Sequence, residues 1–260
     1  MSEPRLRVER HGPIGQMVFD SPARRNAISG AMWRAIPKAV TELEADPEIR
    51  CIVLRGEGKL AFAAGADISE FEKRRASEGA IAEYDGIVDA AQHAIEDSQK
   101  PVIALVHGFC IGGGLEMALA CDLRYASTSS QFAIPAARLG LGYGVHGTSR
   151  LVATVGHAAA REIMFTGRRY SADEALAMGL VNRVLPEDAL DDFVAKIALG
   201  LAANAPLSIA ASKSVIDTLI GAHGDFTKGE ALIARCMASA DYIEGRRAFM
   251  EKRPARFQGK

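Results

Sequence analysis

Short buried strands that alternate with helices are the feature that most restricts how this chain of 260 residues can fold. Residues 51–54 and 102–106 are branched apolar runs bounded by charge or proline, which is typical of strands buried on both faces of a sheet. A third such strand is predicted at 123–126, and helical spacing of apolar residues covers 69–98 between the first two. This alternation predicts an α/β fold.

The N-terminal part predicts a hairpin and a first helix. Residues 6–10 and 16–19 are strand-like runs on either side of a glycine and proline turn. Ser29 is the predicted N-cap of a helix that extends toward Leu43. Pro37 lies inside this helix, and because proline removes a backbone donor we expect it to bend or shorten the helix.

Beyond residue 150 the apolar periodicity is almost wholly helical. Helices are predicted over 158–165, 172–178, 190–203, 207–220 and 227–250. The chain length is at the upper edge of what one hydrophobic core supports. We therefore expect a core domain over residues 1–186 and a smaller helical C-terminal region over 187–260.

Composition argues against several classes of function. The chain has 31 basic and 32 acidic residues and a formal net charge of −1, whereas a nucleic-acid binder normally carries a basic excess. The longest uncharged stretches fall short of the ~18 to 20 apolar residues of a membrane span. The first residues lead into a strand without the pattern of a leader peptide. We expect a cytoplasmic protein with no nucleic-acid or membrane partner.

Common motifs for metals, cofactors and serine nucleophiles do not occur in the sequence. The four cysteines show no CxxC spacing and predict buried hydrophobic side chains, not disulfides or a zinc site. There is no GxSxG and no HExxH. The glycines at 112–114 precede no GK[ST], and Met117 stands where a dinucleotide fingerprint has Gly or Ala. No metal and no separate cofactor are therefore predicted.

Two loops of small residues follow the buried strands. One, residues 108–116, contains three consecutive glycines and ends at Glu116, directly before a helical run; the other covers 60–69. Glycines let a backbone approach a ligand and present free N–H groups. Two N–H groups that converge on one carbonyl oxygen form an oxyanion hole. Taken singly, either loop is also explained as an ordinary turn, with Glu116 favoured by the dipole of the helix.

Together the two loops resemble those of the enoyl-CoA hydratase (crotonase) superfamily. Matching segments continue in the same order along the chain, at 21–27, 100–104, 121–124, 164–167, 175–182 and 251–253. The resemblance implies a crotonase-like spiral of ββα repeats, a helical C-terminal region that mediates trimer contacts, and a homotrimer or a homohexamer built as a dimer of trimers. It also implies a lyase of fatty acid metabolism that acts on an acyl-CoA, with coenzyme A as part of the substrate.

The resemblance implies roles for individual residues. The thioester oxygen would be held by the backbone N–H groups of Ala66 and Gly113, where the charge of an enolate collects. The adenine would lie near a segment that contains Ala64, Asp67 and Ile68. We expect Asp67 to stabilise its loop as a hydrogen-bond acceptor rather than to catalyse.

Four further residues are predicted to contact the substrate or its coenzyme A: Arg24, Gly112, Ala136 and His146. Arg24 is a candidate for the phosphates of the coenzyme, although isolated basic residues are as often solvated. His146 lies close to glycines on either side. A histidine in such a setting is more often a surface loop residue than a catalyst.

The sequence departs from the hydratases of this family at the second of their two catalytic glutamates. Glu116 corresponds to the first. The second falls at Ala136, and no Asp or Glu occurs between Asp122 and Glu162. A positioned acid–base group contributes a factor of ~10² to 10⁴. Its loss predicts a poor hydratase unless another group acts.

Tyr143 offers one such group. A Tyr in this loop resembles the branch of the family that decarboxylates 2-carboxyacyl-CoA thioesters such as methylmalonyl-CoA, although those enzymes carry His where this chain has Ala66. Tyr143 is equally explained as an aromatic residue of the pocket wall. The leading hypothesis is an enoyl-CoA hydratase with Glu116 as acid and base. The alternatives are decarboxylation with Tyr143 as proton donor, enoyl-CoA isomerisation, and a degenerate protein that binds acyl-CoA without turnover.

Overall fold

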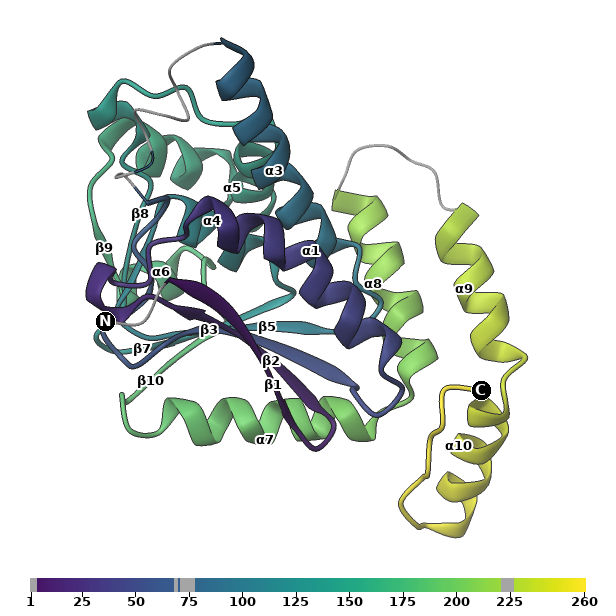
Figure 1. Ribbon diagram of the computed structural model, residues 1–260. Helices are drawn as coiled ribbons and strands as arrows, with labels where there is room; N and C mark the ends of the chain where they lie inside the picture. Colours follow the sequence, from purple (N-terminus) through teal and green to yellow (C-terminus); the bar gives the residue numbers. More distant parts are fainter. Residues whose placement is uncertain (1–3, 68–69, 71–77, 221–226) are drawn as a thin grey trace.

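The computed structural model describes residues 4–67, 70, 78–220 and 227–260, which form two β-sheets covered by helices (Figure 1). The larger sheet has six strands in the order β1-β2-β3-β5-β7-β10. They are β1 (Arg5–His11), β2 (Ile14–Asp20), β3 (Cys51–Gly56), β5 (Val102–Val106), β7 (Leu123–Ser127) and β10 (Arg183–Leu185). β1 and β2 form the predicted antiparallel hairpin, and every other neighbouring pair is parallel. The predicted α/β fold is confirmed.

A second sheet of very short strands lies beside the first. Its order is β4-β6-β8-β9. These strands are β4 (Ala61–Ala63), β6 (Phe109–Ile111), β8 (Gln131–Ala133) and β9 (Tyr170–Ser171). Along the chain β3, β5 and β7 are each followed by a strand of the second sheet and then by a helix, namely α3 (Glu78–Glu96), α4 (Gly113–Ala120) and α5 (Val145–Thr166). This succession is the expected spiral of ββα repeats.

The larger sheet is buried on both faces. Helices α1 (Gly30–Ala45), α3, α4 and α5 lie on one side of it, and α7 (Leu190–Ala203) covers the other (Figure 1). Alternate residues of β3 divide between the two cores: Ile52 packs into the cluster under α1, and Val53 into the cluster with α7. Side chains of a strand alternate between faces, so an apolar run such as 51–54 needs apolar cover on both sides. That prediction is confirmed.

Helix α1 begins where the sequence predicts but passes through its proline. The Ser29 side chain accepts a hydrogen bond from the Met32 N–H at 3.3 Å and caps the helix. The helix continues to Ala45, so Pro37 does not shorten it, and a bend at Pro37 stays a prediction. The buried side chains Ile36 and Val40 lie on either side of Pro37. Their packing offsets the loss of one backbone hydrogen bond.

The second half of the chain is less uniformly helical than its periodicity predicts. Strands β9 and β10 interrupt it, and α6 (Ala172–Ala177) lies between them. The helix predicted over 227–250 is two helices, α9 (Thr227–Met237) and α10 (Ala240–Glu251), because the Ser239 hydroxyl accepts from the Tyr242 N–H at 3.1 Å and starts a new helix. The helix predicted over 69–98 is α3, while 68–69 and 71–77 lie outside the described residues.

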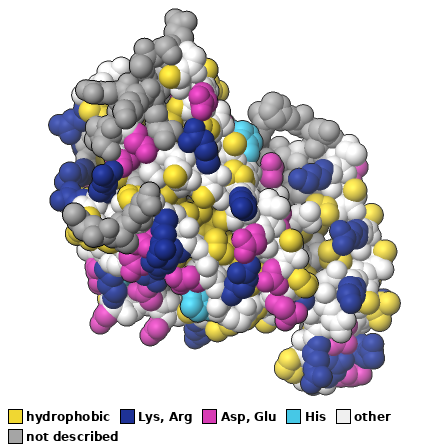
Figure 2. Space-filling model, viewed as in Figure 1, with side chains coloured by type: hydrophobic (Ala, Val, Ile, Leu, Met, Phe, Trp, Pro, Cys, Tyr) yellow, Lys and Arg dark blue, Asp and Glu magenta, His cyan; other side chains and the backbone are white. Residues whose placement is uncertain are grey.

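The C-terminal helices expose much apolar surface. α8 (Pro206–Ile220), α9 and α10 extend away from the sheets, and hydrophobic side chains lie among charged ones over this region (Figures 1 and 2). The larger exposed ones are Ile216, Leu219, Ile220, Ile233, Met237, Ile243 and Met250. Within the described residues no single helix has the length and apolar character needed to cross a membrane. Helices α7 and α8 have them only when taken together, and a bend of 106° separates the two. The division at residue 186 stays a prediction.

Candidate active site

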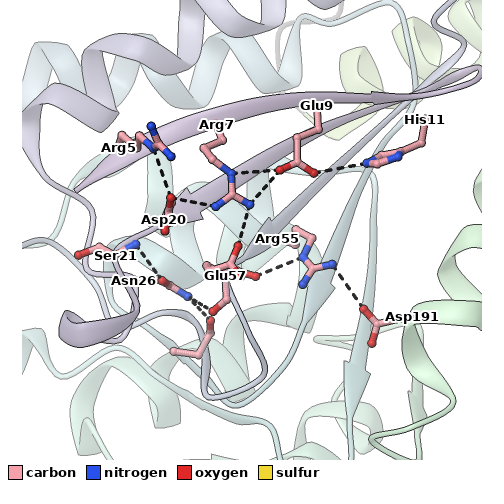
Figure 3. A network of polar contacts seen from close by, with 12 residues as sticks. Arg5, Arg7, Glu9, His11, Asp20, Ser21, Asn26, Arg55, Glu57 and Asp191 are labelled. Atoms are coloured by element: carbon pink, nitrogen blue, oxygen red, sulfur yellow. Dashed lines mark hydrogen bonds and ion pairs between the residues drawn. The ribbon is translucent and has the colours of Figure 1, made fainter. Parts of the chain in front are cut away.

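A buried asparagine fixes the turn after β2. Asn26 accepts from the Ser21 N–H at 3.1 Å and donates to the Glu57 and Ala61 carbonyls at 3.0 and 2.7 Å (Figure 3). Its backbone is left-handed, with φ 56°, a conformation that Asn tolerates better than most residues. The side chain therefore ties the turn at 21–28 to the start of β4. These hydrogen bonds give a structural role to the segment 21–27, which resembles the enoyl-CoA hydratase superfamily.

The turn at 21–28 holds the loop at 64–67 through hydrogen bonds between main-chain groups. The Ala64 N–H donates to the Arg25 carbonyl at 3.0 Å. Ile28 forms a parallel bridge opposite Ala66, donating to the Gly65 carbonyl at 2.8 Å and accepting from the Asp67 N–H at 3.1 Å. In a parallel bridge the N–H of the residue between the two bonded ones, here Ala66, points away from the partner strand. Among the described residues no acceptor is bonded to the Ala66 N–H.

The glycine loop brings a second amide to the same place. The Gly112 N–H donates to the Ala133 carbonyl at 2.8 Å, and α4 begins at Gly113. The first N–H groups of a helix have no partner inside it. A Cβ on Gly113 would lie 3.7 Å from the Ala66 nitrogen, and one on Gly114 would lie 2.4 Å from the Ala63 carbonyl oxygen. Only glycine at 114 allows this close approach of the two loops.

Both loops open into one cavity of about 1200 Å³. Its walls also come from α3, from the short helix η3 (Ala136–Leu139) and from the start of α5. The predicted site residues that line it are Ala64, Ala66, Gly112, Gly113, Glu116, Ala136, Tyr143 and His146. The structure thus gathers residues from four separate stretches of the chain around a space large enough for a small ligand.

Glu116 and Tyr143 lie together on the wall of this cavity, and both are partly buried. Burial raises the pKa of Glu116 to about 7, and the carboxylates of Asp89 and Asp85 add to the rise, while interaction with the Tyr143 hydroxyl opposes it. Burial, followed by the Glu116 charge, raises the pKa of Tyr143 well above its usual value. The hydroxyl is buried and makes no hydrogen bond of regular geometry within the described structure. Near neutral pH Glu116 can therefore exchange a proton, whereas Tyr143 stays protonated.

Arg24 and Asp67 pair with each other outside the cavity lining. Their side chains form an ion pair in which Asp67 is buried and Arg24 is half exposed. The expectation that Asp67 accepts hydrogen bonds within its loop fits this contact. The adjacent Arg25 lies over the ring of Phe109 at 4.9 Å. Ile68 lies outside the described residues.

Ala136 and His146 lie on the cavity wall in different settings. Ala136 is buried at the start of η3 and contributes only a methyl group. His146 is not a residue of a surface loop: it belongs to the first turn of α5, and its Nε2 lies 2.9 Å from Oε2 of the buried Glu96. The His93 ring stacks on it at 4.3 Å. The backbone of α5 is not helical at Gly156, where φ is 74° and ψ is 164°, so α5 is two helical segments. The segment after Gly156 contains the helix predicted over 158–165, and the segment that begins at Val145 was not predicted.

Sequence reasoning missed the contribution of α3. Asp85, Asp89, Gln92 and His93 line the cavity, but they occur in no known motif. Their spacing of three to four residues places them on one face of a helix. A polar stripe in an otherwise apolar helix was the available signal.

Comparisons with known proteins agree with this arrangement. The family model described as Enoyl-CoA hydratase/isomerase matches residues 9–260. A short-chain-enoyl-CoA hydratase of Clostridium acetobutylicum is 34% identical over 95% of this chain and 94% of its own length. The crystal structure of an enoyl-CoA hydratase/isomerase family protein from Hyphomonas neptunium has TM-score 0.93 and 40% identity, covering 98% of each chain. That of an enoyl-CoA hydratase/carnithine racemase from Magnetospirillum magneticum has TM-score 0.93 and 36% identity, covering 100% of this chain and 97% of the other.

Proposed function

Since this chain belongs to the enoyl-CoA hydratase/isomerase family of enzymes, we propose that it is an acyl-CoA lyase whose nominal reaction is the reversible addition of water to a 2-enoyl-CoA. The proposal rests on one observation: the amides of Ala66 and Gly113, which have no acceptor among the described residues, line one cavity with Glu116. Two such donors stabilise the oxyanion of a thioester enolate, and each is worth about 3 to 4 kcal/mol of barrier in comparable sites.

Glu116 acts as the general acid and base in this proposal. Its partly buried carboxyl lines the same cavity as the two amides and has a pKa of about 7, which suits proton transfer near neutral pH. In hydration it removes a proton from the water that attacks the β-carbon and delivers that proton to the α-carbon of the enolate. In the reverse direction it removes the α-proton and gives it to the leaving hydroxyl. The role of the amides is to hold the thioester oxygen while the α-carbon is carbanionic.

We predict that Ala136→Glu increases the hydration of crotonyl-CoA by ~10² or more, because a positioned acid–base group contributes at least that factor. Ala136 lines the cavity, so a longer side chain can extend into it. Loss of the enoyl thioester absorbance measures the rate. Ala136→Gln has the same shape without the acid and is expected to leave the rate unchanged. Equal rates in both variants would show that the missing acid at position 136 is not the cause of slow hydration.

Decarboxylation of a malonyl-type thioester is the second candidate, and the Tyr143 hydroxyl favours it. That hydroxyl is buried, stays protonated near neutral pH and lies next to the Glu116 carboxylate on the cavity wall, so it can donate a proton to a carbanion there. Decarboxylation requires an oxyanion hole and a proton donor but no activated water.

If this reaction operates, Tyr143→Phe is expected to lower carbon dioxide release from methylmalonyl-CoA by ~10² or more. Phe keeps the ring and removes only the hydroxyl. Undiminished release in Tyr143→Phe would exclude Tyr143 as the donor. A Glu116→Gln variant, measured in parallel, separates the two mechanisms because only hydration needs the carboxylate as a base.

A panel of enoyl-CoA and 2-carboxyacyl-CoA thioesters, with products identified by mass spectrometry, tests the proposed function as a whole. Water addition supports hydration, a moved double bond supports isomerisation, and loss of carbon dioxide supports decarboxylation. Tight binding without any product would identify a protein that only binds acyl-CoA. We also propose a homotrimer or homohexamer, supported by the exposed apolar side chains of α8, α9 and α10. The proposed location is cytoplasmic.

A further inference from the structure

The glycine at position 147 leaves the space in which the Glu116 carboxylate lies. Gly147 is buried in the first turn of α5 and lines the cavity. A Cβ on Gly147 would lie 2.8 Å from Oε1 and 3.3 Å from Cγ of Glu116, and 3.2 Å from Cε1 of Tyr143. Non-bonded heavy atoms pack best at about 3.5 to 4.0 Å. The side chain of Glu116 therefore occupies the space that a side chain at position 147 would need.

The backbone of Gly147 does not itself require glycine. Its φ lies outside the left-handed region in which glycine is favoured, and glycine is among the poorest residues inside a helix. Alanine would therefore favour the helical conformation of this turn more than glycine does. What position 147 requires is the absence of a side chain, and the atoms that need this space belong to Glu116 and Tyr143.

Contacts with α3 hold the first turn of α5 in place. His146 directly precedes Gly147, and its Nε2 lies 3.1 and 2.9 Å from the two carboxylate oxygens of Glu96. Arg150, one turn later, pairs with the same carboxylate. Glu96 is buried, and a buried carboxylate is costly to separate from its partners. A methyl group added at position 147 is therefore expected to displace the Glu116 side chain rather than the helix.

The displacement would be large enough to affect a reaction. Oε1 of Glu116, which lies 2.8 Å from the position of that Cβ, would have to move by about 0.5 Å or more to reach a normal contact distance. An error of about 1 Å in the position of a reacting group can lower a rate by ~10². The carboxyl is the free end of a side chain, so its movement costs little in folding and much in alignment.

We propose that Gly147 is a positioning residue for Glu116: the space left by its missing side chain fixes where the carboxylate lies on the cavity wall. Gly147 exchanges no proton and acts only through Glu116. The effect on the rate rests on the proposed function, because it requires Glu116 to be the acid and base. The effect on the place of the carboxylate does not depend on the reaction.

The test compares Gly147→Ala with the wild type, in crystal structures and in the hydration of crotonyl-CoA. The Glu116 carboxylate should be displaced by about 0.5 Å or more, and kcat should fall by ~10- to 100-fold. The dissociation constant of a saturated acyl-CoA should stay unchanged. In a Glu116→Gln background the alanine should have no further effect on kcat. An undiminished effect in that background would show that the methyl group crowds the substrate, and would overturn the proposal.

Gly200→Ala is the matched control, since Gly200 is exposed inside α7 and a Cβ there would meet no atom within 4 Å. It is expected to react at the rate of the wild type, and circular dichroism verifies that both variants fold. An unmoved Glu116 carboxylate, or a wild-type rate in Gly147→Ala while Glu116→Gln is slow, overturns this proposal alone. Undiminished hydration in Glu116→Gln refutes the proposed function of Glu116, and the positioning role is refuted with it.

Discussion

Glu116→Gln is expected to lower the hydration of crotonyl-CoA by ~10² to 10⁴, because the variant keeps the shape of the side chain but cannot accept a proton. Thioester binding should persist, since the amides of Ala66 and Gly113 are main-chain groups outside this side chain. Steady-state rates and the dissociation constant of a saturated acyl-CoA separate the two effects. Undiminished turnover in the variant would show that the base is another group.

The pH profile provides an independent check on Glu116. Its pKa is raised to about 7, and a general base must be ionised to act. The hydration rate should therefore increase with pH through about 7 and level off above it. A rate that instead falls across this interval would mean that the working form is the protonated acid.

The same variant is expected to be more stable above neutral pH. The raised pKa means that the folded chain holds its proton more tightly than the unfolded one, whose pKa is near 4.5. The free energy of unfolding therefore falls between pH 4.5 and 7, by up to about 3 kcal/mol. Gln removes this dependence. The free energy of unfolding measured with denaturant should therefore be higher for Glu116→Gln than for the wild type at pH 8, and nearly equal at pH 4.

Gly113→Pro is expected to slow turnover by about 10² to 10³ relative to Gly113→Ala, because it removes one donor to the oxyanion. Proline is well tolerated at the first position of a helix, which Gly113 occupies. Gly112 has ψ −121°, away from the helical values that a following proline disfavours. The rate of the chemical step in single-turnover kinetics measures the loss.

Gly113→Ala is the control for the added side chain. Its Cβ would lie 3.1 Å from Trp33, a tight contact that proline would make as well, but the N–H is kept. If both variants lose activity equally, the cause is crowding against Trp33, and the amide has no special role.

Sequence patterns predicted the elements that have long-range apolar periodicity and missed those that do not. The strands at 51–54 and 102–106 were evident because both of their faces are buried. Strands β4, β6 and β8 are three residues long, too short to show a period of two. Their pairing is set by the spiral of the chain rather than by local preference.

The sequence predicted the parts of the candidate site that main-chain groups form. It did not predict the contacts between side chains that are far apart in the sequence. The loops around Ala66 and Gly113 are recognisable because small residues are required there. The contact of His146 with Glu96 joins residues 50 positions apart, and no motif spans that interval. The interpretation of His146 as a residue of a surface loop failed for this reason.

The way in which the turn at 21–28 supports Ala66 has a consequence for how such enzymes diversify. Main-chain bonds to Arg25 and Ile28 hold the loop, and the Asp67 side chain beside them pairs with Arg24. The side chain at 66 therefore takes no part in holding its own amide. If the proposed function holds, evolution can exchange that side chain, for example for an imidazole, and so alter the reaction that follows enolate formation. The two main-chain amides that would stabilise the enolate would be inherited unchanged.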